Sequence, residues 1–130
     1  MSFDIYLDEK ECVHCHRGGG PTWQRNLTHN VNRIVDLCLL AGGATVAKGE
    51  EAEKHYHDWS WGRLGGWSAE DAAPILALAL IEAQKPERME EFRKLEPPNG
   101  WGSLGAVIEV LGAFHAACLA NPGTTVSTSG

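Results

Sequence analysis

The sequence predicts an α+β fold, in which strands from the two ends of the chain form a small sheet and about three or four helices pack on it. Two observations carry this prediction. Apolar and polar residues alternate at both ends, as in half-buried strands, whereas apolar residues in between recur every three or four positions, as on one helix face. A chain of 130 residues has the length of one domain, so residues 1–130 are expected to form a single domain.

The expected strands are short. Phe3–Leu7 alternates apolar with polar residues and contains aromatic and β-branched members, which favour strands. A second strand or hairpin arm is expected near Thr22–Asn26, and a final strand over Thr124–Thr128. We expect the final strand to pair with the first, which would place both chain ends on the same side of the molecule.

The first helix is expected to begin at Thr28, whose hydroxyl can cap free backbone N–H groups. The residues of its buried face follow helical spacing: Val31, Ile34, Val35 and Cys38. Gly42-Gly43 should end this helix, because glycine readily adopts the left-handed conformation that follows many helix C-termini.

Two further helices are expected before residue 96. Asp71 is a plausible cap for the first of them, and that choice places Pro74 in the first turn, where its missing N–H costs little. A short helix rich in charged residues should follow Pro86 and end near Leu95.

Ser103 is expected to cap the last helix, and the Asn-Pro-Gly sequence at 121–123 should stop it. Glycine and alanine are frequent in this helix, so neighbouring elements can approach it closely. Cys38 and Cys118 each lie on the apolar face of an expected helix. Buried core thiols are therefore expected at these two positions.

Residues 44–67 show no clean periodicity, although Lys48–Asp58 could form a short charged helix. Irregular segments of this length are uncommon unless they are functional, so we expect an insertion or a lid over a ligand. Trp59, Trp61 and Trp67 add three aromatic side chains, either as a cover for the domain or as a surface for a ligand or partner.

The charge and hydropathy of the chain exclude some classes of partner. A formal net charge of −6 argues against long nucleic acid, which requires a broad basic face, but leaves room for a small anionic ligand. The sequence shows no membrane span and no signal peptide, so no membrane partner and a cytoplasmic location are expected.

The most informative motif lies near the start, where Cys12, His14, Cys15 and His16 precede three glycines. The two cysteines could ligate zinc, with His14, His16 or a distant histidine completing the site, because zinc prefers thiolate and imidazole ligands. A reduced thiol pair in a hairpin turn is the simpler alternative. A thioredoxin-like redox role is disfavoured, since such a motif normally opens a helix and glycines oppose one.

Polar side chains gather at the start of the first helix, where free backbone N–H groups can hold phosphate or carboxylate. The candidate ligand-binding residues there are Arg25, Asn26, Thr28, His29, Asn30 and Arg33. Ordinary capping by Thr28 and Asn30 is the alternative explanation.

Asn99-Gly-Trp-Gly102 is a turn that presents one large aromatic side chain. Trp101 can stack on a nucleobase or a sugar, and Asn99 can hydrogen-bond to it. The alternative is that Trp101 anchors the start of the last helix to the core.

Several segments together resemble a group of small phage and bacterial proteins. These segments are Met1–Leu7, Cys12–Cys15, Asn26–Asn30, Glu96–Gly102 and Ala116–Pro122 before a terminal strand. The resemblance covers most of the chain apart from about residues 44–58, which look like an insertion carrying His55 and His57. It implies a phage setting, and hence the host cytosol, but it implies no catalytic activity.

Three function classes follow. The favoured one is a binding protein that sequesters a nucleotide-derived immune signal, such as a cyclic ADP-ribose isomer or a cyclic oligonucleotide, and so blunts host defence. A metal-dependent nucleotide hydrolase is the second, using His55, His57 and Asp58 with the Cys/His stretch. A zinc-stabilised protein-interaction domain is the third, and homo-oligomerisation is left open. The sequence has no triad signature, P-loop or Rossmann fingerprint, which favours binding over catalysis.

Overall fold

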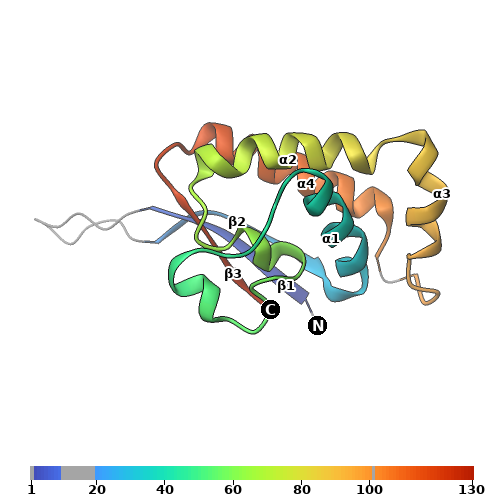
Figure 1. Cartoon of the computed structure of the whole chain (residues 1–130), viewed down its shortest axis with the longest axis horizontal. Helices are drawn as coiled ribbons and strands as arrows, with labels where there is room; N and C mark the ends of the chain where they lie inside the picture. Colours follow the sequence, from blue (N-terminus) through green and yellow to red (C-terminus); the bar gives the residue numbers. More distant parts are fainter. Residues whose placement is uncertain (1, 10–19, 101) are drawn as a thin grey trace, which may run out of the picture.

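The computed structural model describes residues 2–9, 20–100 and 102–130. Within them, three strands form one antiparallel sheet in the order β2-β1-β3: β1 (Ser2–Asp8), β2 (Pro21–Thr28) and β3 (Thr125–Ser129). Figure 1 shows the two ends of the chain beside each other, because the start of β1 pairs with the end of β3. The predicted α+β class and the predicted pairing of the first and last strands are confirmed.

The alternating pattern of β1 decides which face of the sheet is buried. Phe3, Ile5 and Leu7 are at most 2% exposed, whereas the residues between them are partly exposed. Successive side chains of a strand point to opposite faces, so one face of the sheet carries the core. Leu27 of β2 and Val126 of β3 extend this buried face on either side.

The described residues include four α-helices: α1 (Asn32–Ala41), α2 (Ala69–Ala83), α3 (Pro86–Lys94) and α4 (Leu104–Ala120). Helices α2 and α4 lie side by side, α1 packs against α2, and α4 also contacts β2 (Figure 1). In the described part of the chain, no helix combines the length and apolar character that crossing a membrane requires.

Side-chain caps fix where the helices begin. Thr28 accepts a hydrogen bond from the backbone N–H of Asn30 and caps a short 3₁₀ helix, η1 (His29–Val31), which leads into α1. Ser103 caps α4, as predicted. The predicted cap of α2 is wrong: Ser68 accepts the N–H of Asp71 itself at 3.1 Å, so the helix begins earlier. Pro74 therefore lies inside α2 rather than in its first turn.

The segment 44–67 has little α-helical character and contains two short 3₁₀ helices, η2 (Gly49–Glu53) and η3 (Ser60–Leu64). The expected helix over Lys48–Asp58 is therefore limited to η2. Through η3 the segment packs against both α1 and β3. Trp61 and Leu64 are fully buried, so the segment supplies part of the core.

Cys38 and Cys118 are buried free thiols, as predicted. Burial disfavours the charged thiolate and raises the pKa of each thiol to about 12. These two cysteines are consequently poor nucleophiles, because the thiolate is the reactive form.

Candidate functional site

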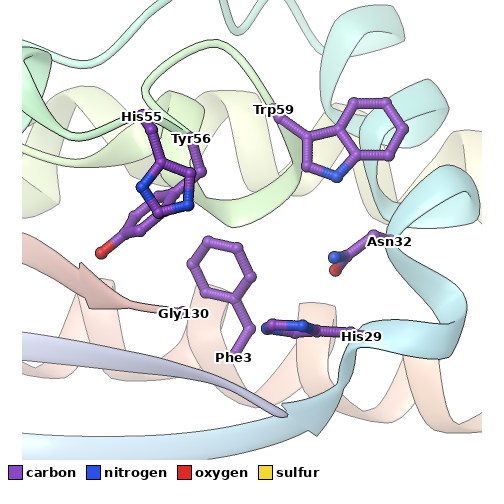
Figure 2. A pocket seen from close by; sticks show the side chains of 7 residues that line it. All are labelled: Phe3, His29, Asn32, His55, Tyr56, Trp59 and Gly130. Atoms are coloured by element: carbon purple, nitrogen blue, oxygen red, sulfur yellow. The ribbon is translucent and has the colours of Figure 1, made fainter. Parts of the chain in front are cut away.

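A cavity of about 420 Å³ lies where the start of β1, the start of α1 and residues 55–59 meet. Figure 2 shows the side chains that line it. They are mostly aromatic or imidazole groups: Phe3, His29, Asn32, His55, Tyr56, Trp59 and Gly130. Mostly apolar walls with a few convergent polar groups, at volumes of about 300–1,000 Å³, are typical of small-molecule sites.

Edge-to-face contacts hold the aromatic walls in place. The ring of Phe3 lies 5.0 Å from that of Tyr56, with the planes at 77°, and 5.5 Å from that of His29, with the planes at 61°. His55 contacts the other side of Tyr56 in the same manner, at 4.9 Å between ring centroids. Such arrangements contribute about 0.5–1.5 kcal/mol per aromatic pair beyond area burial, so the cavity is largely preformed.

Tyr56 is fixed at both its ends. Its hydroxyl donates a hydrogen bond to the carbonyl oxygen of Thr128 in β3, at 3.1 Å. Its backbone approaches Gly62 so closely that a Cβ at Gly62 would lie 2.0 Å from the carbonyl oxygen of Tyr56. Only glycine fits there, and the wall of the cavity is thereby held against η3.

A strained residue orients the tryptophan in the cavity wall. Ser60 has a positive φ of 52°, in the left-handed region that residues with a Cβ seldom adopt. This geometry separates two neighbours: Trp61 is fully buried in the core, while Trp59 lines the cavity. Strain of this kind costs about 1–3 kcal/mol and persists only where the surroundings enforce it.

Asp36 is the group that enforces the Ser60 conformation. Its carboxylate is buried in α1 and accepts the backbone N–H of Ser60 at 2.9 Å and Nε of Arg63 at 2.6 Å. Arg63 also donates to the carbonyl oxygen of Thr45, at 2.7 Å. The carboxylate of Asp36 therefore holds Ser60 and Arg63 directly, and Arg63 in turn holds Thr45.

The polar side chains that line the cavity are those of His29, Asn32, His55, Tyr56 and Trp59. Asn32 accepts a hydrogen bond from the hydroxyl of Ser60 through Oδ1, at 3.0 Å. Within the described residues, Nδ2 of Asn32 and the indole Nε1 of Trp59 have no hydrogen-bond acceptor, and Nε2 of His29 is buried without a partner. Among the described residues that line the cavity there is no Asp, Glu, Lys or Arg.

The structure spreads the predicted ligand-binding residues over several surfaces. His29 lines the cavity, whereas Thr28 caps η1. Arg25 forms an ion pair with Glu109 of α4, and Asn26 donates to Asp4 of β1 at 2.8 Å. Adjacent residues of a strand face opposite ways, so Arg25 and Asn26 belong to different faces of the sheet.

The remaining candidates lie near the start of α1. Asn30 and Arg33 are exposed there. Gly102 packs against the same corner, since a Cβ on it would lie 2.9 Å from the side chain of Thr28, so the end of the Asn-Gly-Trp-Gly turn does approach the Asn26–Asn30 element. Asn99 is exposed in that turn, and Trp101 lies outside the described residues.

The predicted zinc ligands Cys12, His14, Cys15 and His16 also lie outside the described residues, so the zinc site stays a prediction. In the part of the chain that the structure describes, no group of three His, Cys, Asp or Glu side chains is placed to hold a metal ion. Of the residues considered for a hydrolase, His55 lines the cavity, and Nδ1 of His57 lies 2.8 Å from the carbonyl oxygen of Lys54.

Sequence reasoning missed Phe3, Asn32 and Tyr56 as site residues, and Asp36 as their support. Phe3 looks like an ordinary core residue of a strand, and Asn32 and Asp36 look like the polar face of a helix. The useful signal was the aromatic-rich irregular segment 44–67, which supplies Tyr56 and Trp59.

Comparison of the chain with family models, with curated proteins and with solved structures gives no match.

Proposed function

We propose that the protein binds and sequesters a small nucleotide-derived molecule, such as a cyclic oligonucleotide or a cyclic ADP-ribose isomer, without converting it. The observation that carries the proposal is the aromatic-walled cavity of about 420 Å³. Aromatic side chains hold nucleobases by stacking, which contributes about 1–3 kcal/mol for each base.

The composition of the cavity supports entry of the base rather than of the phosphates. Phe3, Tyr56 and Trp59 offer aromatic surface, and the lining residues that the structure describes include no Asp, Glu, Lys or Arg. Phosphates would stay outside, beside the exposed Asn30 and Arg33 at the start of α1. A guanidinium there matches a phosphate through charge-assisted hydrogen bonds.

The resemblance to small phage proteins supports a role against host defence. A protein that holds a nucleotide signal lowers its free concentration, so it blunts the response without any chemistry of its own. The metal-dependent hydrolase and the zinc-stabilised interaction domain stay predictions that depend on Cys12, Cys15 and their neighbouring histidines.

Calorimetric titration with cyclic dinucleotides and cyclic ADP-ribose isomers tests this proposal. At least one compound should bind below millimolar concentration, and denaturation of the complex should release it chemically intact. Trp59→Ala should weaken binding by about tenfold or more, because it removes both aromatic contact area and an indole N–H donor from the cavity wall. Trp67→Ala is the matched control, because Trp67 packs under Lys48 and does not line the cavity.

Two results would contradict the proposal. Release of a cleaved product would identify an enzyme rather than a sequestering protein. A nucleotide whose affinity is unaffected by Trp59→Ala but lost on Trp67→Ala would place the binding site elsewhere on the molecule.

A further inference from the structure

We infer that the cavity selects its ligand by a ring edge that carries two hydrogen-bond acceptors, and that Asn32 and Trp59 set this selectivity. The inference rests on the proposed function, which places a base in the cavity. It assigns the preferred base as one of the guanine type, including hypoxanthine, over adenine. Among the ligands proposed above, it therefore favours a guanine-containing cyclic oligonucleotide over an adenine-containing cyclic ADP-ribose isomer.

The orientation of Asn32 provides the first donor. Its Oδ1 is already engaged, because the hydroxyl of Ser60 donates to it at 3.0 Å. Ser60 is held in turn by Asp36, which accepts its backbone N–H at 2.9 Å. An amide whose oxygen is engaged presents its NH₂ group, so Asn32 offers donors to the cavity.

Trp59 provides the second donor. An indole Nε1–H can donate but cannot accept. Figure 2 shows this nitrogen on the edge of the indole that faces the side-chain amide of Asn32. Within the described residues, neither this N–H nor Nδ2 of Asn32 has an acceptor, so two donors lie together on this wall of the cavity.

The purine bases differ at the edge that such donors would contact. Guanine presents two adjacent acceptors, O6 and N7, whereas adenine presents the acceptor N7 beside the donor N6–H₂. Hypoxanthine shares O6 and N7 with guanine. Adenine could accept one hydrogen bond through N7, but its amino group would face the second N–H and leave that donor unpaired, which disfavours its binding.

The test compares four purine nucleotides by calorimetry: GMP, IMP, AMP and 7-deaza-GMP. GMP and IMP should bind with similar affinity, while AMP and 7-deaza-GMP should each bind about tenfold more weakly or worse, as expected for the loss of one good base-edge contact. In ¹H–¹⁵N NMR spectra, the indole N–H signal of Trp59 should shift on addition of GMP. This signal is identified by its absence from the spectrum of Trp59→Phe.

Two variants separate selectivity from affinity. Trp59→Phe keeps an aromatic ring but removes the N–H, so GMP should bind more weakly while AMP is little affected. Asn32→Asp keeps an oxygen for Ser60 and replaces the donors with an acceptor, so the preference for GMP over AMP should shrink or reverse. Trp67→Phe removes an indole N–H that donates to Val46 and should leave the preference unchanged. Thermal melting of each variant confirms that it is folded.

The outcomes distinguish this inference from the proposed function. If GMP and AMP bind equally and both shift the Trp59 indole signal, the selectivity is wrong and the binding function stands. If AMP binds more tightly than GMP, the inference is overturned in the same way. If no purine nucleotide binds or moves that signal, the inference and the nucleotide-binding proposal both fail.

Discussion

At Ser60, a single backbone angle decides where two tryptophans point. The left-handed φ of 52° sends Trp61 into the core and leaves Trp59 at the cavity. Nothing in the local sequence marks Ser60 for this conformation, because glycine and asparagine are the residues that favour it. The conformation comes instead from Asp36 and Asn32, which lie more than twenty residues earlier and bond to the backbone and hydroxyl of Ser60.

Substitutions at Ser60 should reveal the cost of this conformation. Ser60→Gly and Ser60→Ala both remove the hydrogen bond to Asn32. Glycine also removes the left-handed penalty, which stabilises the folded state by about 1–2 kcal/mol. The greater backbone freedom that glycine loses on folding costs less, about 0.5–1 kcal/mol. The glycine variant should therefore have the higher free energy of unfolding in urea denaturation. The reverse order would mean that Ser60 is not left-handed in solution.

The thiols of Cys38 and Cys118 should make the protein sensitive to alkali. Burial raises the pKa of each from 9.0 to about 12, so an unfolded chain loses these protons at lower pH than the folded one. The free energy of unfolding should then fall as pH rises between these two values, by up to about 1.4 kcal/mol per pH unit for each thiol. Below pH 9.0 both states are protonated and the effect vanishes.

Urea denaturation at increasing pH measures this slope. The variant in which both cysteines are alanine provides the comparison, since its other groups titrate as in the original protein. Its stability should decline less steeply with pH above 9.0. Parallel declines would show that the two thiols ionise as readily in the folded protein as in the unfolded chain.

The carboxylate of Asp36 is the charged group that joins α1 to the segment 44–67. The side chain of Asp36 is 3% exposed and that of Arg63 15%, so their ion pair is largely shielded from water. Losing one partner leaves the other charge uncompensated, and the backbone N–H of Ser60 also loses its acceptor. The cavity wall that carries Tyr56 and Trp59 depends on this attachment.

Asp36→Ala should therefore lower the free energy of unfolding by about 3 kcal/mol and weaken ligand binding as well. Glu109→Ala is the matched control, since it breaks the ion pair between Arg25 and Glu109. The side chain of Arg25 is 38% exposed and that of Glu109 is 67% exposed. Exposed pairs contribute at most about 1 kcal/mol, so the control should stay close to the original stability in chemical denaturation. Equal losses in the two variants would contradict the proposed role of Asp36.

Sequence patterns predicted the regular elements because their causes are local. Alternation identified β1 and β3, and the hydroxyls of Thr28 and Ser103 marked helix starts. The start of α2 was missed because Ser68 and Asp71 are both good caps, and the choice depends on backbone geometry. The cavity could be predicted only in part, since its walls combine residues from opposite ends of the chain with contacts such as Asp36 to Ser60.

The sheet joins the beginning of the described chain to its end, with β1 in the middle. The pairing of β1 with β3 joins residues more than 110 positions apart, so the fold depends on contacts between residues far apart in sequence. Such contacts close slowly, because the entropy cost of the long loop comes before any gain from pairing.

This order has a consequence for synthesis on the ribosome. Strand β1 emerges before β3 and keeps one edge unpaired until β3 has been made, and an unpaired edge invites association with other chains. Tyr56 also lacks its acceptor, the carbonyl oxygen of Thr128, until that moment. A nascent chain therefore cannot complete the cavity wall, and the ability to capture a ligand arises only when the last strand takes its place.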